Sequence, residues 1–91
     1  MRAEWDLVLD KVMAQNDHSA LVTLFELLLT EEERSAVAGR LKVFQTLLHK
    51  EMSQRQIAQE YQISIATITR CSNYLKHMTE EQRQQIKQLT L

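Results

Sequence analysis

The stretch SQRQIAQEYQISIATITRCSNYL, residues 53–75, predicts two short helices joined by a tight turn. Ser53 is followed three residues later by Gln56, which is the pattern of a capping box that opens the first helix. Ser64 is suited to begin the second helix, because its hydroxyl can accept a hydrogen bond from a backbone N–H of the first turn. Two helices joined by a turn of three or four residues form a helix-turn-helix, whose second helix enters the major groove of DNA.

The apolar residues of this stretch recur at helical spacing, so that the two helices can pack on each other. Small Ala58 would allow a close crossing, and Ile63 would be buried in the turn. The expected apolar faces are Ile57, Ala58 and Tyr61 in the first helix and Ile65, Ile68 and Leu75 in the second.

Outside this stretch, the sequence predicts four more helices, at about residues 3–14, 19–29, 30–50 and 79–90. Capping boxes recur at Thr30 with Glu33 and at Thr79 with Gln82. The chain has no proline and one glycine, so little favours strands or hairpins. The expected fold class is therefore all-α, with six helices. In the helix at 30–50 we expect an apolar row at Val37, Leu41, Phe44 and Leu48, broadened by Ala36, Val43 and Leu47.

The helix expected at residues 19–29 has hardly any polar face. Its apolar residues are Leu21, Val22, Leu24, Phe25, Leu27, Leu28 and Leu29. A helix that is apolar on all sides must be buried on all sides, and a chain of 91 residues has little interior in which to bury one. We therefore expect an obligate homodimer, in which a second copy covers this helix. The alternative is a monomeric bundle with the helix at its centre.

Charge is distributed unevenly along the chain. Residues 1–52 carry six basic and nine acidic groups, whereas residues 53–77 carry three basic groups and one acidic group. A local positive surface on an acidic body is compatible with DNA binding, although this imbalance alone is weak evidence. The single cysteine, Cys71, excludes a disulfide within the chain and suits a reducing compartment. With no signal-like segment and no apolar run near the roughly 20 residues that span a bilayer, we expect a cytoplasmic protein without a membrane partner.

Enzymatic constellations are absent from the sequence. His18, His49 and His77 are far apart, and none has a Cys or carboxylate at metal-ligand spacing. One glycine cannot make a phosphate-binding loop. Arg70 beside Cys71 could activate the thiol, but on this helix a small packed residue is the favoured interpretation of Cys71. We therefore expect no enzyme activity, no metal and no cofactor.

The basic and short side chains of residues 53–75 are suited to contact DNA. Arg55, in the first turn of its helix, can reach a phosphate or a guanine edge. If Ile68 points inward, Ile65, Ala66 and Thr69 point outward; such short side chains supply few bidentate base contacts. Part of any specificity would then come through backbone groups, water or DNA shape. On position alone, Arg70 is equally well interpreted as a plain surface arginine.

Over essentially its whole length, the chain resembles the bacterial tryptophan repressors. The segments that carry the resemblance are Glu4-Trp5, Gln15-Asn16-Asp17, LLLT (27–30) followed by Glu33-Arg34, Arg40, EMSQR (51–55), IATITR (65–70), Ser72-Asn73 and Leu75-Lys76. The resemblance implies an intertwined dimer of six-helix subunits, with dimerisation helices in 1–50, the helix-turn-helix in 53–76 and a C-terminal helix in 79–90. It also implies that L-tryptophan binds between the subunits as a corepressor and raises the affinity for double-stranded operator DNA.

The resemblance assigns roles to individual residues. Arg40 and Arg70 would sandwich the indole, with Arg70 also meeting the ligand carboxylate; guanidinium stacking on an aromatic face is physically reasonable. Leu27, Leu29 and Thr30 would line the site from the other subunit, partly through backbone carbonyls, and Thr67 would lie between ligand and DNA. The implied operator contacts are Gln54, Arg55, Ile65, Ala66, Thr67, Thr69 and Lys76.

Three residues depart from the family pattern. Cys71 stands where the family has a glycine at the indole, and Tyr74 replaces a serine whose hydroxyl assists ammonium binding, so both are counted with the effector site and would crowd it. Ala58 replaces a lysine that helps to hold phosphate, which would lower DNA affinity and its salt dependence. Our hypothesis is that DNA recognition is retained while effector selectivity has changed or weakened.

Two alternatives remain open from the sequence. The same DNA-binding dimer could respond to a different small molecule, or to none. The chain could also be a helical dimerisation module that has lost DNA binding, although Arg55 and the IATITR segment argue against this.

Overall fold

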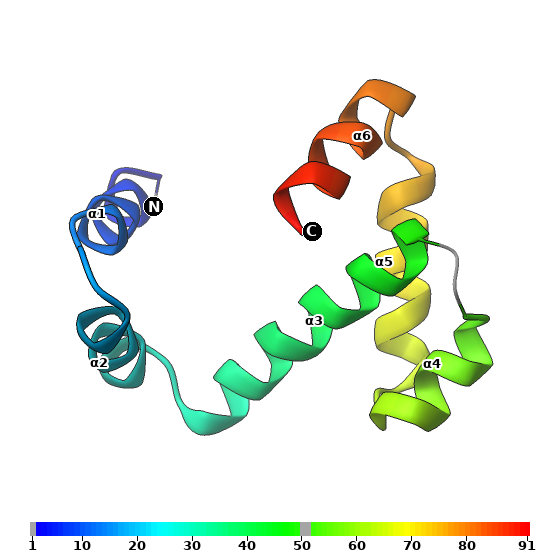
Figure 1. Cartoon of the computed structure of the whole chain (residues 1–91), viewed down its shortest axis with the longest axis horizontal. Helices are drawn as coiled ribbons and strands as arrows, with labels where there is room; N and C mark the ends of the chain where they lie inside the picture. Colours follow the sequence, from blue (N-terminus) through cyan, green and yellow to red (C-terminus); the bar gives the residue numbers. More distant parts are fainter. Residues whose placement is uncertain (1, 50–51) are drawn as a thin grey trace. The chain divides into compact units, whose positions relative to one another are not determined.

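The computed structural model describes residues 2–49 and 52–91 and consists of six helices over these residues (Figure 1). They are α1 Arg2–Met13, α2 His18–Leu28, α3 Glu31–His49, α4 Gln54–Tyr61, α5 Ile65–Lys76 and α6 Glu80–Leu89. The described residues contain no strand, so the predicted all-α class is confirmed. Lys50 and Glu51, which the prediction placed at the end of the long helix and in the EMSQR segment, lie outside the described residues.

All three predicted capping boxes are present and set where their helices begin. In each box the hydroxyl of the N-cap residue accepts a hydrogen bond from the backbone N–H of the residue three positions later. The side chain of that later residue accepts one from the backbone N–H of the N-cap residue. Two backbone donors that would otherwise lack partners are thereby satisfied. The pairs are Thr30 with Glu33 (3.1 and 2.9 Å), Ser53 with Gln56 (3.2 and 2.8 Å) and Thr79 with Gln82 (3.1 and 3.0 Å).

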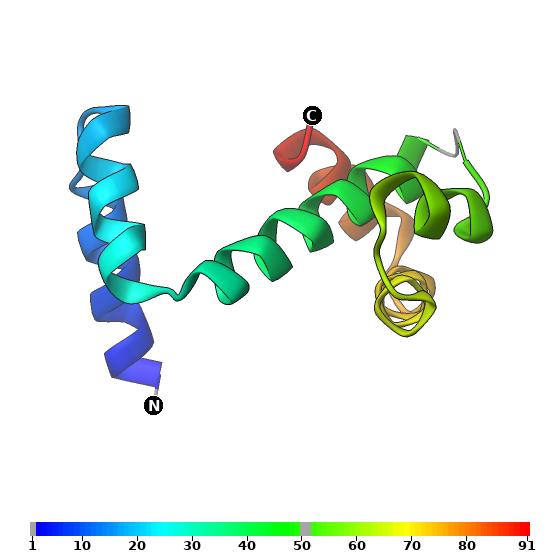
Figure 2. The ribbon, with the colours of Figure 1, turned by 90° about the horizontal axis from the view of Figure 1, so that it is seen from below.

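The chain divides into two units, residues 1–34 and 35–91, and each is described by itself. In the first unit α1 and α2 run antiparallel (Figure 2). Asp17 is the N-cap of α2, because its carboxylate accepts from the backbone N–H of Ala20 at 2.7 Å. No residue of this unit with a described side chain is buried, and Leu27 of α2 is 81% exposed. The all-round burial expected of α2 is therefore not supplied within its own unit.

The second unit has a small apolar core formed by α3, α4 and α5. The core cluster consists of Val43, Ile57, Ile68 and Cys71. Half-buried side chains pack around this cluster: Phe44, Leu47, Met52, Ala58, Tyr61 and Ile63. Figures 1 and 2 show α5 crossing the C-terminal half of α3 beside α4. Lys42 of α3 also lies over the Tyr61 ring of α4, with its Nζ 5.0 Å from the ring centroid, which adds a cation–π contact between these helices.

The burial pattern of α3 and α5 differs in two places from the predicted one. In α3 the fully buried positions are Val43 and Thr46, whereas Val37 and Leu41 of the predicted row are about half exposed. The core cluster of this unit lies against the C-terminal half of α3 and does not include the row's first members. Ile65, expected in the apolar face of α5, is also half exposed, because the buried residues of α5 begin at Ile68.

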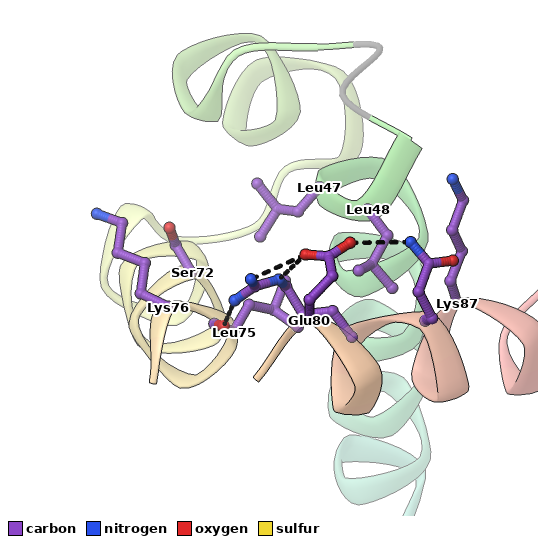
Figure 3. Close-up of a pocket in the computed structure, with 9 residues that line it drawn as sticks. Leu47, Leu48, Ser72, Leu75, Lys76, Glu80 and Lys87 are labelled. Carbon is purple, nitrogen blue, oxygen red and sulfur yellow. Dashed lines mark hydrogen bonds and ion pairs between the residues drawn. The ribbon is translucent and has the colours of Figure 1, made fainter. Parts of the chain in front are cut away.

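Helix α6 is tied to its neighbours at both ends. At its C-terminal end, the Gln45 amide of α3 donates to the backbone carbonyl of Thr90. At its N-terminal end, Nη1 of Arg83 donates to the carbonyl of Leu75 (3.1 Å), in the last turn of α5, and to that of Met78 (2.7 Å), just after the helix. Nε and Nη2 of the same guanidinium donate to one carboxylate oxygen of Glu80, at 3.2 and 2.9 Å (Figure 3). Because the last carbonyls of a helix have no partner within it, Arg83 completes the end of α5 from another helix.

Candidate nucleic-acid interface and ligand site

The helix-turn-helix is built by a turn of three residues between α4 and α5. Gln62 ends α4 in the left-handed conformation, with φ 55° and ψ 44°, which reverses the chain direction after the helix. Ile63 packs against the core cluster. Ser64 caps α5: its Oγ accepts from the backbone N–H of Thr67 at 3.2 Å and donates to the Thr67 hydroxyl at 2.9 Å. The turn is therefore held by a core contact on one side and a cap on the other.

Gly39 of α3 faces the side chain of the turn residue Ile63. A Cβ built at Gly39 would lie 3.6 Å from Cδ1 of Ile63, an ordinary contact distance. The side chain that anchors the turn therefore lies directly against the backbone of α3.

Most of the side chains predicted to contact DNA are exposed on α4 and α5. Arg55 and Lys76 are exposed and make no ion pair with another described residue. Arg55 lies in the first turn of α4 and Lys76 is the last residue of α5, so these two charges lie on both helices of the motif. The remaining predicted contacts are exposed Ile65, Ala66 and Thr69 and half-buried Gln54 and Thr67.

Two arginines from different helices act on the same thiol. Burial raises the pKa of the Cys71 thiol, while Arg40 of α3 and then Arg70 of α5 partly oppose this by favouring the thiolate. Both guanidiniums therefore lie within electrostatic reach of one point between α3 and α5. These are the two arginines that the resemblance assigns to a ligand, and that role stays a prediction. Cys71 itself is 4% exposed and belongs to the core cluster.

An aromatic pair lies one helical turn beyond the two arginines along α3 and α5. The ring of Tyr74 in α5 meets the ring of Phe44 in α3 edge to face, with centroids 6.2 Å apart and planes at 69°. Residues four apart lie on the same face of a helix, so Phe44 follows Arg40 and Tyr74 follows Arg70 on their respective faces. Tyr74 remains 61% exposed. Phe44 was not predicted as part of this site; its only sequence signal was the spacing of four from Arg40.

Leu27, Leu29 and Thr30 belong to the first unit, at the end of α2 and the start of α3. The Leu29 carbonyl accepts a hydrogen bond from Nη1 of Arg34 at 2.7 Å, and Thr30 serves as the cap of α3. A carbonyl oxygen has two lone pairs, so Leu29 retains capacity for a second donor. Because this unit is described by itself, the ligand role of these three residues stays a prediction.

A separate cavity of about 370 Å³ lies between α3, α5 and α6 (Figure 3). Lys76 is the only predicted site residue that lines it. The nine lining residues are Leu47, Leu48, Ser72, Leu75, Lys76, Glu80, Arg83, Gln84 and Lys87. Elsewhere in residues 2–49 and 52–91, no three His, Cys, Asp or Glu side chains are grouped so as to hold a metal ion. None of the described helices combines the length and the apolar character needed to cross a bilayer.

Comparison with known proteins identifies the family to which the sequence of this chain is similar. The family model described as Trp repressor protein matches residues 3–90. A Trp operon repressor homolog from Vibrio cholerae serotype O1 is 41% identical, over 98% of this chain and 86% of its own length. Homologs of the same name from Vibrio vulnificus and Aliivibrio fischeri are each 39% identical, over 94% and 89% of this chain and 84% and 75% of their own lengths. The chain belongs to the Trp repressor family.

Proposed function

We propose that this protein is a transcriptional repressor that binds operator DNA as a homodimer in the cytoplasm and uses L-tryptophan as its corepressor. The observation that carries the proposal is the α4–turn–α5 motif, which presents exposed cations and short side chains in a chain of the Trp repressor family. Regulation, and not catalysis, is the activity that this family name describes.

On the DNA side, the charged residues are proposed to position the protein and the short ones to read sequence. Arg55 and Lys76 would contact phosphates or a guanine edge, since long cationic side chains reach both. Ile65, Ala66 and Thr69, exposed at the start of α5, would meet base edges and thymine methyl groups. Gln54 and Thr67, both half-buried, would add contacts at the first turns of α4 and α5.

The dimer is supported by apolar surface that the single chain leaves uncovered. In the first unit, Trp5 and Leu27 are 61% and 81% exposed, and no described side chain is buried. In α3, Val37 and Leu41 are about half exposed although they lie in a helical apolar row. Patches of this kind are typical of association surfaces. A second copy of the same chain would cover them and remove them from water.

The effector site is proposed to lie where Arg40 and Arg70 converge. Their guanidiniums could stack on the two faces of an indole, and Arg70 could also bind the carboxylate. Leu27, Leu29 and Thr30 of the second copy would complete the site, partly through backbone carbonyls that accept from the ligand ammonium. Thr67, one turn before Cys71 in α5, would lie between ligand and DNA.

The experiment that tests this function is selection of bound DNA from a random duplex pool, with and without L-tryptophan. The proposal expects one enriched, two-fold symmetric sequence that is recovered only, or far more strongly, with the ligand. Recovery of the same sequence regardless of ligand would instead support the second candidate, an effector-independent or differently regulated repressor. The exposed ring of Tyr74 beside the arginine pair is the observation that favours this candidate.

A gel shift at low salt separates both candidates from a dimerisation module that does not bind DNA. Wild-type chain should retard the selected duplex, and Arg55→Ala should weaken retardation because it removes a phosphate or guanine contact. No retardation of any duplex by the wild-type dimer would refute DNA binding.

A further inference from the structure

Two side chains beside the arginine pair depart from the family pattern, and the structure separates their roles. Cys71 is 4% exposed, whereas Tyr74, one turn further along α5, is 61% exposed. The two residues are three positions apart on one helix, so they lie near the same face but at very different depths.

The Cys71 side chain is part of the core and not of an open surface. It belongs to one buried cluster with Val43, Ile57 and Ile68. Burial also raises the pKa of its thiol, so at neutral pH the group is uncharged and adds no electrostatic preference. A ligand held by the exposed heads of Arg40 and Arg70 would therefore find little of Cys71 to touch.

The Tyr74 side chain, in contrast to that of Cys71, lies at the surface. Its ring packs edge to face on Phe44, which follows Arg40 by one turn of α3 just as Tyr74 follows Arg70 by one turn of α5. The aromatic pair therefore adjoins the arginine pair along both helices. A planar ligand held between the two guanidiniums would therefore lie about one helical turn from the Tyr74 ring.

We propose that Tyr74, and not Cys71, determines how strongly this site binds L-tryptophan, by a ring that must be moved off Phe44 before the ligand can seat. This rests on the proposed function, because it takes the convergence of Arg40 and Arg70 as the effector site. An edge-to-face aromatic pair of this geometry corresponds to about two- to tenfold in an equilibrium constant. That is the smallest penalty the ring imposes, since direct crowding of the ligand adds to it.

Calorimetric titration of the full-length protein with L-tryptophan tests the proposal. Tyr74→Ser should bind the ligand at least two- to tenfold more tightly than wild type. Tyr74→Phe should bind like wild type, because the ring remains. Cys71→Ala, the matched truncation of the other departing side chain, should stay within about twofold of wild type. Tighter binding by Cys71→Ala with no gain in Tyr74→Ser would overturn the proposal, as would Tyr74→Phe matching Tyr74→Ser.

A second variant covers the case in which Tyr74→Ser folds poorly, as judged by far-UV circular dichroism. Phe44→Leu keeps an apolar residue against the core but removes the ring that holds Tyr74, so it should also tighten L-tryptophan binding. Unchanged or weaker binding by a folded Phe44→Leu protein counts against the proposal.

Failure of the inference and failure of the proposed function give different results. If wild type binds L-tryptophan and Tyr74→Ser binds no more tightly, only the role of Tyr74 is refuted. If neither wild type nor any folded variant binds L-tryptophan, while all of them retard the selected duplex, the tryptophan response itself is refuted and DNA binding stands.

Discussion

Removing the Arg83 guanidinium should cost the protein more stability than a surface arginine normally would. In Arg83→Ala, the carbonyls of Leu75 and Met78 lose donors at 3.1 and 2.7 Å, and Glu80 loses its ion pair at 2.9 Å. Hydrogen bonds from a charged donor contribute about 1.5–3 kcal/mol each when buried. Because the Arg83 side chain is 34% exposed, solvent screens these bonds, and we expect a total loss of about 1.5–3 kcal/mol.

Most of this loss should come from the carbonyl bonds and little from the ion pair. The Glu80 side chain is 70% exposed, and exposed ion pairs contribute only about 0–1 kcal/mol. Glu80→Gln is therefore the matched control: it removes the charge from the pair but leaves the bonds from Arg83 to Leu75 and Met78. We expect it to cost less than about 1 kcal/mol.

Urea denaturation followed by circular dichroism measures the stability of both variants, at one fixed protein concentration because the proposed association would contribute to stability. The slope of unfolding free energy against urea concentration should be the same for wild type and both variants, so that their midpoints can be compared directly. Equal losses in the two variants would refute the reasoning, because they would show that Arg83 acts through Glu80 and not by completing the end of α5.

Four further predictions follow from single side chains. Gly39→Ala should raise the unfolding free energy by about 0.5–1 kcal/mol in urea, because alanine is the better helix former and the new Cβ would lie at an ordinary 3.6 Å from its nearest neighbour. Ile57→Ala should lower the same quantity by about 2–5 kcal/mol, since Ile57 is fully buried, whereas half-exposed Ile65→Ala should change it by less than about 1 kcal/mol; similar values for the two would contradict the core described above. Burial raises the pKa of the Cys71 thiol above its ordinary value of 9.0, so the folded state holds the thiol proton more tightly than the unfolded state does. The free energy of unfolding should therefore fall as pH rises from about 9 through the raised pKa. In thermal melts, Cys71→Ala should remove this loss at alkaline pH. Lys76→Ala should weaken DNA binding about equally for all duplexes and reduce the slope of log affinity against log salt by about 1 in gel shifts, and an unchanged slope would exclude a phosphate contact.

Features decided by neighbours in sequence could be predicted from the sequence. Ser53 with Gln56 and Ser64 before α5 both cap where expected, because a cap joins groups two or three residues apart and needs no knowledge of the rest of the fold.

Features decided by contacts between distant segments could not be predicted. Periodicity shows that α3 has apolar residues on one side, but not that the core selects Val43 and Thr46 over Val37. Burial of Thr46 leaves its hydroxyl with a hydrogen-bond partner, because the hydroxyl donates to the Lys42 carbonyl at 2.8 Å. The contact between Phe44 and Tyr74 joins residues 30 positions apart and has no local signal.

In the candidate site, too, the sequence predicted some features and not others. The resemblance assigned Arg40 and Arg70 to a ligand; in the structure both guanidiniums favour the thiolate of Cys71, and their ligand role stays a prediction. The position of Cys71 on its helix favoured a small packed residue, and the core cluster confirms it, whereas the resemblance alone had counted Cys71 with the ligand site.

In the proposed homodimer, the stability of the first unit depends on protein concentration, because no described side chain of this unit is buried within it. Isolated helices of about a dozen residues are marginal in water, so α1 and α2 persist only while another apolar surface covers them. Residues 35–91 have a core of their own and do not share this dependence. On dilution, the first 34 residues should lose their helices and become sensitive to proteases before the rest of the chain does. In the proposed homodimer, newly made protein would therefore be most susceptible to proteolysis while its concentration is too low for two copies to pair.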